Sequence, residues 1–436
     1  MFYRKIEEKL DKYYKNKDSK ILVIDGARQI GKSFIVRETA KKYFKNYIEI
    51  NLKSDYDGNR IFESVKTIDS FYLNVSALYG DKLSNIDETI IFLDEIQCYP
   101  NLLSLLKDLK LDNRYRYIAS GSLLGITLKH IFIPMGSIEE VKMYPMDFEE
   151  FLLANNIGKD VIAYLKDCFI NLKEVDSGVH KTIINKFKEY LICGGLPDSV
   201  REFVINKNVF QARKNQELTY SYYKDDAAQY DIEHNLKIRT IYDYLPSYME
   251  NKVKRLQYKK IENKRNSNYQ TYEDEFDYLI NSGCALGVKA VSNPKFPLVD
   301  SVAKNLIKLY YNDVGILSYL LFGDNINTIL QEDTGTNLGS LYETACATEL
   351  AAHGKKLFYY DNKKKGEVDF LLNDYEQANI YAIEVKSGKD QNNYRAIPKL
   401  VKDPYNISKG FILANKNLVE ENDNLITLPI YMIMFI

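Results

Sequence analysis

The feature that most restricts the fold of this chain is a glycine loop between a short apolar run and a helix-length segment. The apolar run at 21–24 is followed by Gly26-Ala27-Arg28-Gln29-Ile30-Gly31-Lys32-Ser33, and residues 34–43 are typical of a helix. Glycine permits the positive φ angles and the close backbone approach that let successive N–H groups surround a phosphate. Strand, loop and helix in this order predict a P-loop in an α/β fold with a parallel sheet.

The loop residues have separate expected tasks in binding ATP. We expect Lys32 to contact the β- and γ-phosphates and Ser33 to bind Mg²⁺ through its hydroxyl. The helix that follows adds its positive N-terminal end. The alternative, a chance match in a glycine turn, is disfavoured by the strand before the loop and the helix after it. The other expected ATP-binding residues are Gly26, Ala27, Arg28, Gln29, Ile30 and Gly31.

A second motif supplies the acidic partner that a P-loop needs. The apolar run at 90–93 ends in Asp94-Glu95. We expect Asp94 to hold the magnesium ion and Glu95 to act as the general base that polarises the attacking water, with Lys32 as a further catalytic group. The alternative for Glu95 is a plain surface carboxylate. The two motifs together predict a magnesium-dependent ATPase with ATP and Mg²⁺ as its ligands.

The next expected strand, at 115–119, ends in Ser120-Gly121-Ser122 at the same edge of the sheet. Ser120 or Ser122 either senses the γ-phosphate or belongs to an ordinary turn. Three arginines are candidates for stabilising transition-state charge or for marking the subunit interface of a homo-oligomer. They are Arg28, Arg114 and Arg116.

Changes in the hydrophobic pattern divide the chain into four expected segments. Residues 1–150 alternate short apolar runs with helix-length segments, which predicts a parallel sheet covered by helices. Residues 151–230 read as a helical lid or linker. Residues 231–325 read as short helices followed by a hairpin, an order that suggests a winged helix. Residues 326–436 read as a second α/β domain. Its expected strands are at 357–360, 367–372, 380–386, 409–414 and 425–435.

Two acids and a lysine mark this last segment. Asp369 and Glu384 lie on strands that we expect to form a hairpin, and Lys386 follows Glu384 on the same strand face. Two carboxylates that hold Mg²⁺ or Mn²⁺, with a lysine beside them, form the constellation of PD-(D/E)xK phosphodiesterases. Glu343, on the preceding helix, is a further candidate metal ligand, and Lys386 a candidate catalytic group. The alternative is that these acids pair with the lysines at 363–365.

Five motifs together resemble a widespread, largely uncharacterised prokaryotic family. They are GARQIGKS, LDEIQ at 93–97, SGS at 120–122, YPMDFEEF at 144–151 and CGGLP at 193–197. The resemblance implies an AAA-type ATPase domain joined to a C-terminal domain of unknown function with a nuclease-like, restriction-endonuclease-like α/β fold. Many members carry Gly-Arg just before the YPMDFEEF-like segment, where this chain has Gly136-Ser137. An arginine sensor at that position is therefore not expected here.

Composition limits the environment and the partners. With 59 Lys plus Arg against 60 Asp plus Glu, the whole molecule offers no strong attraction for nucleic acid, so that DNA or RNA would bind at local patches. The five cysteines form no CxxC pair, and no apolar run approaches the roughly 20 residues of a membrane helix. We therefore expect a cytoplasmic protein without a membrane partner. The histidines, at 130, 180, 234 and 353, show no metal-ligand spacing.

Three functional hypotheses follow from these patterns. In the first, the nucleotide state of a magnesium-dependent ATPase controls a nuclease-like domain that acts on DNA or RNA. In the second, the C-terminal domain is a catalytically silent module that binds nucleic acid or protein. In the third, nucleotide sets the oligomeric state of a scaffold and turnover is negligible.

Overall fold

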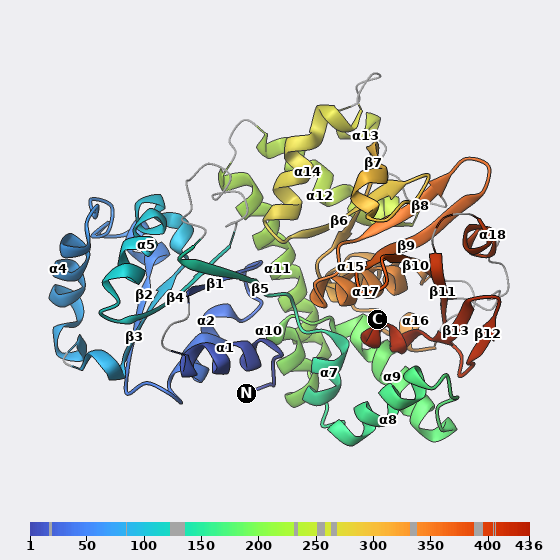
Figure 1. Cartoon of the computed structure of the whole chain (residues 1–436), viewed down its shortest axis with the longest axis horizontal. Helices are drawn as coiled ribbons and strands as arrows, with labels where there is room; N and C mark the ends of the chain where they lie inside the picture. The colour runs from blue at the N-terminus through green and yellow to red at the C-terminus, as the bar shows by residue number, and fades with distance from the viewer. Residues whose placement is uncertain are drawn as a thin grey trace. The chain divides into compact units, whose positions relative to one another are not determined.

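The computed structural model describes residues 1–16, 20–83, 85–122, 136–230, 234–250, 258–262, 268–331, 338–387, 396–403, 405 and 407–436. The chain divides into two compact units (Figure 1). The first unit contains residues 3–144 with Met1 and 281–283, and the second contains 145–280 and 284–436 with Phe2.

The first unit is built on a five-stranded sheet in the order β2-β3-β4-β1-β5. All neighbouring strands of this sheet are parallel. Every residue of β1 and β3 is buried, as expected for central strands covered on both faces. The expected α/β fold with a parallel sheet is therefore confirmed. The strands are β1 (Ile21–Asp25), β2 (Asn46–Asn51), β3 (Thr89–Asp94), β4 (Arg116–Gly121) and β5 (Ile138–Lys142).

Helices cover this sheet. One apolar cluster joins Ile91 of β3 to Phe71 of α4 and Leu106 of α5. Helix α5 begins with Pro100, whose missing N–H costs nothing at a first helical position, and it ends at Asn113 in the left-handed region. The helices are α1 (Ile6–Lys15), α2 (Lys32–Ala40), α3 (Leu52–Asp57), α4 (Ile68–Tyr79) and α5 (Pro100–Asp112).

The second unit starts with helices and continues into a mixed sheet. The helices before the sheet are α7 (Phe148–Ala154), α8 (Lys159–Ile170), α9 (Ser177–Cys193), α10 (Pro197–Val200), α11 (Val209–Tyr230), α12 (Asn235–Met249), α13 (Lys259–Glu262) and α14 (Glu273–Asn281). Later helices are α15 (Val314–Phe322), α16 (Asn327–Gln331), α17 (Gly339–Ala352) and α18 (Ile397–Lys402). No helix in the described part of the chain combines the length and the apolar character needed to cross a membrane.

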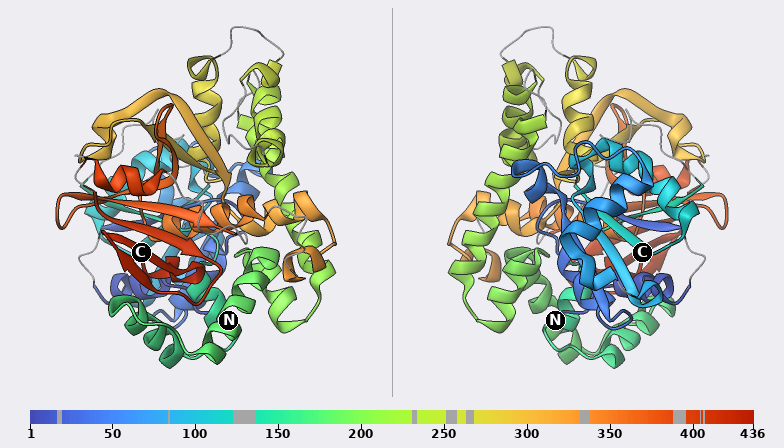
Figure 2. Two further views of the ribbon diagram at one scale, coloured as in Figure 1. Left: turned by 90° about the vertical axis from the view of Figure 1, so that its right-hand side faces the viewer. Right: turned by 90° about the vertical axis from the view of Figure 1, so that its left-hand side faces the viewer.

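The sheet of the second unit has eight strands in the order β12-β13-β11-β10-β9-β8-β6-β7. In Figure 2 its strands, coloured from yellow to red, lie side by side. The expected hairpin of β9 and β10 is present, with Ile383 opposite Phe370. The strands are β6 (Ala285–Val291), β7 (Val302–Tyr311), β8 (Phe358–Asn362), β9 (Gly366–Asp374), β10 (Asn379–Lys386), β11 (Ile407–Ala414), β12 (Glu420–Asn422) and β13 (Leu425–Pro429).

Two local expectations differ from the structure. The hairpin expected near 285–299 forms as β6 and β7, but β6 pairs in parallel with β8, so that it extends the C-terminal sheet instead of forming the wing of a separate winged helix. The strand expected at 425–435 ends at Pro429, and Ile430–Phe435 forms a 3₁₀ helix. Proline has no N–H to continue a strand ladder, and the apolar residues beyond it are buried by helix packing instead.

The CGGLP and YPMDFEEF motifs contact each other inside the second unit. The amide of Met146 donates to the carbonyl of Gly195 at 2.7 Å, and the amide of Gly195 donates to Asp313 at 2.6 Å. A Cβ atom on Gly195 would lie 2.0 Å from the carbonyl oxygen of Met146, so that a side chain has no room there. Gly194 has φ +66°, which favours glycine. The two glycines are therefore required by packing.

Candidate functional site

The glycine loop has the backbone that phosphate binding requires. A Cβ atom on Gly26 would lie 2.3 Å from the carbonyl oxygen of Met143, so that a side chain is excluded at this position. Gly31 has φ 92° and precedes the first residue of α2. The positive end of α2 therefore begins directly at Lys32, where a phosphate would be bound.

Lys32 is buried within the loop that it belongs to. Its ammonium group donates to the carbonyl oxygens of Gly26 and Ala27, each at 2.8 Å. Burial lowers the pKa of Lys32, and the charges of Glu95 and Asp94 offset part of that effect. The loop thus holds a buried cation next to two acids, and an incoming triphosphate is a stronger partner for it than two neutral carbonyl groups.

Ser33 and Asp94 meet as the sequence predicts for a magnesium site. The Ser33 hydroxyl lies 2.9 Å from both carboxylate oxygens of Asp94. The Ser120 hydroxyl donates to the same carboxylate. Burial raises the pKa of Asp94 in spite of these two donors. A hydroxyl and a carboxylate are oxygen ligands that suit Mg²⁺, and a cation here would favour the charged carboxylate, so that these residues fit the ion.

Glu95 lies at the end of β3 in a left-handed conformation, with φ 59°. This region is uncommon for residues other than glycine, and such strain gathers at functional sites. One carboxylate oxygen of Glu95 accepts from the Gln97 amide nitrogen and, at 3.1 Å, from the Ser122 hydroxyl. Burial acts to raise the pKa of Glu95, but Lys32 and the Gln97 hydrogen bond outweigh burial and lower it. Glu95 is therefore an ionised, fixed carboxylate, as a general base must be.

Gln97 is the residue at this site to which sequence reasoning gave no role. Its amide nitrogen contacts both Glu95 and Ser122, and its side chain is buried. The guanidinium of Arg28 also reaches Ser122, at 3.4 Å. Ser120 and Ser122 thus contact the two acids that we assign to the metal and to water. Their role as phosphate sensors stays a prediction.

The other two candidate arginines contact their own unit. Arg114 lies over the ring of Tyr72, with 4.1 Å from the guanidinium carbon to the ring centroid. Arg116 donates to the carbonyl oxygens of Asn16 and Tyr13, beside the end of α1. Both arginines thus have partners that stabilise the first unit.

The predicted C-terminal residues come together in the second unit, but with other partners than a metal. Lys386 donates to Glu384 at 2.7 Å, and Asp369 accepts from the Val385 amide at 2.8 Å. Glu343 accepts from the Tyr310 hydroxyl at 3.3 Å. Burial raises the pKa of Glu384 although Lys386 and Lys308 lower it. Of the lysine run, Lys365 pairs with Asp403 at 2.6 Å and not with these acids.

Lys308 and Glu367 are two members of this cluster to which the sequence analysis gave no role. The ammonium group of Lys308, on β7, is completely buried and pairs with Glu367. Glu367, Glu343 and Asp369 together raise the pKa of Lys308 against the effect of burial. A lysine inside the apolar stretch at 306–311 was the available signal. We call Lys308, Glu343, Glu367, Asp369, Glu384 and Lys386 the acid–lysine cluster.

The acids of the acid–lysine cluster do not form a compact group of three ligand atoms in this structure. Among the described residues, ligand atoms from three side chains lie within 4.8 Å of one another at Asp147, Glu349 and His353 instead. Glu343, Asp369 and Glu384 do not form such a group. Their role as metal ligands stays a prediction, and we derive no chemical step through a metal bound to them.

Comparisons with known proteins agree with the geometry of the first unit. Residues 18–152 match a family described as an AAA domain. The first unit has the P-loop NTPase fold. Residues 184–328 and 338–433 match two domains of unknown function, DUF8612 and DUF4143. The C-terminal match names no activity, so that a nuclease at this end of the chain remains a prediction.

One relative matches most of the chain at low identity, and a second matches about half of it. The chain is 23% identical over 394 residues to Uncharacterized protein MJ1544 of Methanocaldococcus jannaschii, a match that covers 88% of this chain and 79% of that protein. Uncharacterized protein MJ1637 of the same organism is 27% identical over 206 residues, which are 46% of this chain and 43% of that protein. Among solved structures, the Walker-type ATPase PABY2304 of Pyrococcus abyssi is 14% identical with a TM-score of 0.43, covering 74% of this chain and 96% of that chain.

Proposed function

We propose that the first unit hydrolyses ATP in the presence of Mg²⁺. The observation that carries the proposal is the arrangement around β3, where Asp94 contacts Ser33 while Glu95 is ionised and held by two hydrogen bonds. Each of these residues has a separate task in phosphoryl transfer to water, and all of them lie at the same edge of the sheet.

Each residue of the site has a separate task in ATP hydrolysis. Lys32 exchanges its two carbonyl partners for phosphate oxygens and balances the charge that develops during transfer. Ser33 and Asp94 hold Mg²⁺, which neutralises phosphate charge when it is bound. Glu95 orients a water molecule and accepts its proton. Gln97 and Ser122 fix the carboxylate, so that little reorganisation is needed during reaction.

Two variants test this proposal. Glu95→Gln is expected to bind ATP with unchanged affinity and to lose about 10²–10⁴-fold in kcat, the usual contribution of a general base. Lys32→Ala is expected to lose ATP binding as well as turnover. Lys45→Ala, which removes an exposed lysine paired with Glu88, is the matched control and is expected to keep both. Wild-type turnover in purified Glu95→Gln or Lys32→Ala would refute the assignment.

For the second unit we propose that the acid–lysine cluster engages DNA or RNA and that nucleotide binding in the first unit controls this step. Two forms of the proposal remain, a metal-dependent nuclease and a module that binds without cleaving. The ion pairs of Lys308 and Lys386 favour the second form, because cations of the protein already balance two of the acids. The cluster itself has four acids against two paired lysines, so that attraction of a phosphate backbone would come from the neighbouring lysine run at 363–365.

Incubation of the full chain with labelled DNA and RNA, with Mg²⁺ or Mn²⁺ and with or without ATP, separates the two forms. Cleavage that is lost in Asp369→Asn supports the nuclease. Salt-sensitive binding without cleavage, present in the wild type and in Asp369→Asn, supports the silent module. The absence of both binding and cleavage overturns the proposal for this unit and leaves the ATPase assignment to its own test.

A further inference from the structure

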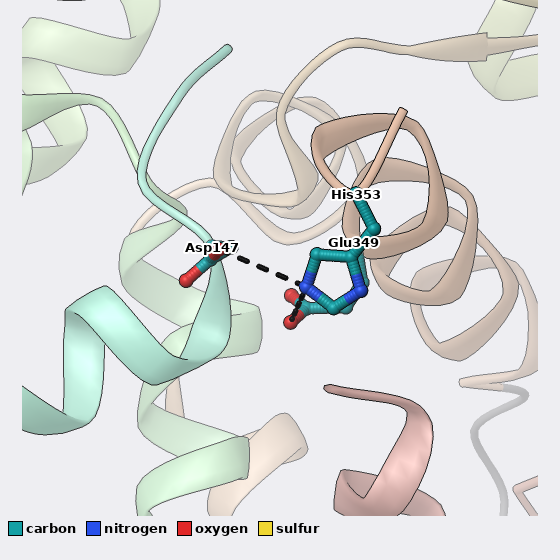
Figure 3. Close-up of side chains that lie close together, drawn as sticks. All are labelled: Asp147, Glu349 and His353. Carbon is teal, nitrogen blue, oxygen red and sulfur yellow. Dashed lines mark ion pairs between the residues drawn. The ribbon is translucent and has the colours of Figure 1, made fainter. Parts of the chain in front are cut away.

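Three chemically suitable side chains, none of them assigned a role above, meet in the second unit (Figure 3). Asp147 is the N-cap of α7, and Glu349 and His353 lie one helical turn apart, at the end of α17. The imidazole Nε2 atom of His353 lies 3.4 Å from Oε1 of Glu349 and 3.8 Å from Oδ2 of Asp147. One ligand atom from each of the three residues lies within 4.8 Å of the other two.

The backbone fixes both carboxylates so that one oxygen of each faces the imidazole. Oδ1 of Asp147 accepts from the Glu150 amide at 2.9 Å, as part of a capping box. Oε2 of Glu349 accepts from the Phe148 amide at 2.9 Å. The second oxygen of each carboxylate therefore points to His353. Hydrogen bonds from neighbouring groups commonly orient the ligands of a metal centre. Here the backbone amides of Glu150 and Phe148 orient the two carboxylates.

Glu349 provides the second observation. Its side chain is 1% exposed, and Oε1, which faces Nε2 of His353 at 3.4 Å, accepts no hydrogen bond from the residues that the structure describes. A buried carboxylate oxygen without a donor costs free energy that a bound cation would return.

We propose that Asp147, Glu349 and His353 bind one divalent transition-metal ion, of which Zn²⁺ is the best candidate. An imidazole nitrogen is a preferred ligand of Zn²⁺ and related ions, whereas Mg²⁺ and Ca²⁺ prefer oxygen ligands throughout. Ligand atoms about 2.1 Å from a tetrahedral ion lie roughly 3.4 Å apart, close to the separations found here. Three protein ligands leave a position for water, and His353, 16% exposed, faces solvent in part.

A bound ion would link the start of α7, through Asp147, to the end of α17, through Glu349 and His353. The contact joins residues that are about two hundred positions apart, and α17 also carries Glu343 of the acid–lysine cluster. The site goes beyond the proposed ATPase and nucleic-acid functions, because none of its three ligands belongs to either set of residues. Its expected role is structural, since a bound ion stabilises the folded state by linkage.

The test uses the full chain after removal of metal with a chelator, titrated with Co²⁺ in excess Mg²⁺ so that oxygen-only sites are filled. Visible absorption reports Co²⁺ coordination, and competition by Zn²⁺ gives the Zn²⁺ affinity. We expect one Co²⁺ ion per chain, displaced by Zn²⁺. His353→Gln and Glu349→Gln are each expected to weaken binding by at least about 10–100-fold, the cost of replacing even an outer partner of a metal ligand.

Controls distinguish loss of the site from loss of the fold. His180→Gln removes a histidine that contacts Tyr431 and is expected to bind Co²⁺ like the wild type. Glu349→Gln retains an oxygen that can accept from the Phe148 amide, and circular dichroism shows whether each variant is folded. The proposal is overturned if the folded wild type gives no Co²⁺ spectrum, or if His353→Gln binds Co²⁺ as tightly as the wild type does.

Discussion

Replacing Lys308 with methionine is expected to destabilise the second unit strongly. The Lys308 side chain is fully buried, its ammonium group pairs with Glu367, and it lies 4.6 Å from the ring centroid of Tyr359. Methionine has a similar length and leaves no large cavity, so that the change removes mainly a charge. The carboxylates around it, those of Glu343 and Asp369 included, would then lose a neighbouring cation.

The expected loss in the free energy of unfolding depends on how deeply Lys308 and its partners are buried. Removing one partner of a buried ion pair costs about 3–5 kcal/mol. We expect the lower end of this range here, because Glu367 is 30% exposed and can be solvated, whereas the neighbouring Glu343 and Glu384 are buried. The pair of Lys365 with Asp403 is the matched comparison, since its side chains are 36% and 20% exposed. A pair that faces water contributes about 0–1 kcal/mol. We therefore expect Lys308→Met to cost several times as much as Lys365→Met.

Urea unfolding followed by far-UV circular dichroism measures both variants. Tyrosine fluorescence is a second probe, because the chain has 36 tyrosines and no tryptophan. Lys308→Met with a free energy of unfolding within about 1 kcal/mol of the wild type, and equal to that of Lys365→Met, would refute the reasoning. Such a result would mean that the acids near Lys308 are solvated or protonated in the folded protein.

The pH dependence gives an independent check on the same variant. Lys308 is among the groups that lower the pKa of Glu384, against the larger raising effect of burial. Removal of the Lys308 ammonium group therefore raises the pKa of Glu384 in the folded state further. A carboxyl group with a raised folded pKa stabilises the protein fully below its unfolded pKa, and this contribution is lost as the pH rises through the folded pKa. The deficit of Lys308→Met is therefore expected to be largest at neutral pH and to shrink toward about pH 4.

Three further predictions concern single residues. Gly195→Ala is expected to lower the free energy of unfolding by about 3 kcal/mol or more, since a Cβ atom would lie 2.0 Å from the carbonyl oxygen of Met146. Gly80→Ala, which has open space around its Cβ, is the control and should stay within about 1 kcal/mol of the wild type in the same urea assay. Burial raises the pKa of Asp313 from 3.8 to about 6. The stabilising contribution of this carboxyl group is therefore complete below about pH 4 and is lost above about pH 6. In Asp313→Asn, the resulting decrease of roughly 3 kcal/mol should be absent from a plot of the free energy of unfolding against pH. Ser33→Ala is expected to retain ATP binding without Mg²⁺ and to lose most Mg²⁺-stimulated turnover, which a Mg²⁺ titration of ATP hydrolysis would show; an unchanged titration would remove Ser33 from the metal site.

Sequence reasoning succeeded where one contiguous segment contains the whole signal. The glycine loop, the strand before it and the helix after it are neighbours in the chain, and Asp94 with Glu95 ends a strand whose apolar pattern is clear. The role of Gln97 was missed because it depends on the left-handed backbone at Glu95, which redirects the chain after β3. Because the residue with positive φ is a glutamate and not a glycine, the sequence does not indicate this turn.

Interactions between distant segments account for the remaining errors. Glu349 and His353 stand at the i, i+4 spacing that places two side chains on one helix face, so that two of the three proposed metal ligands were neighbours in the sequence. Asp147 joins them only through the tertiary fold. The partner of β6 was likewise not predictable, because its pairing with β8 skips more than sixty residues and depends on the register of the sheet.

The pairing of β6 with β8 determines how this protein can be cut into pieces. The third family match begins at residue 338, but the sheet that holds its acids also contains β6 and β7, from 285 to 311. A fragment starting at 338 would leave the edge of β8 with unpaired N–H and C=O groups and would lack Lys308, so that it should aggregate. Truncation experiments on the C-terminal region should therefore begin upstream of Ala285, because the start of the family match is not a boundary of folding here.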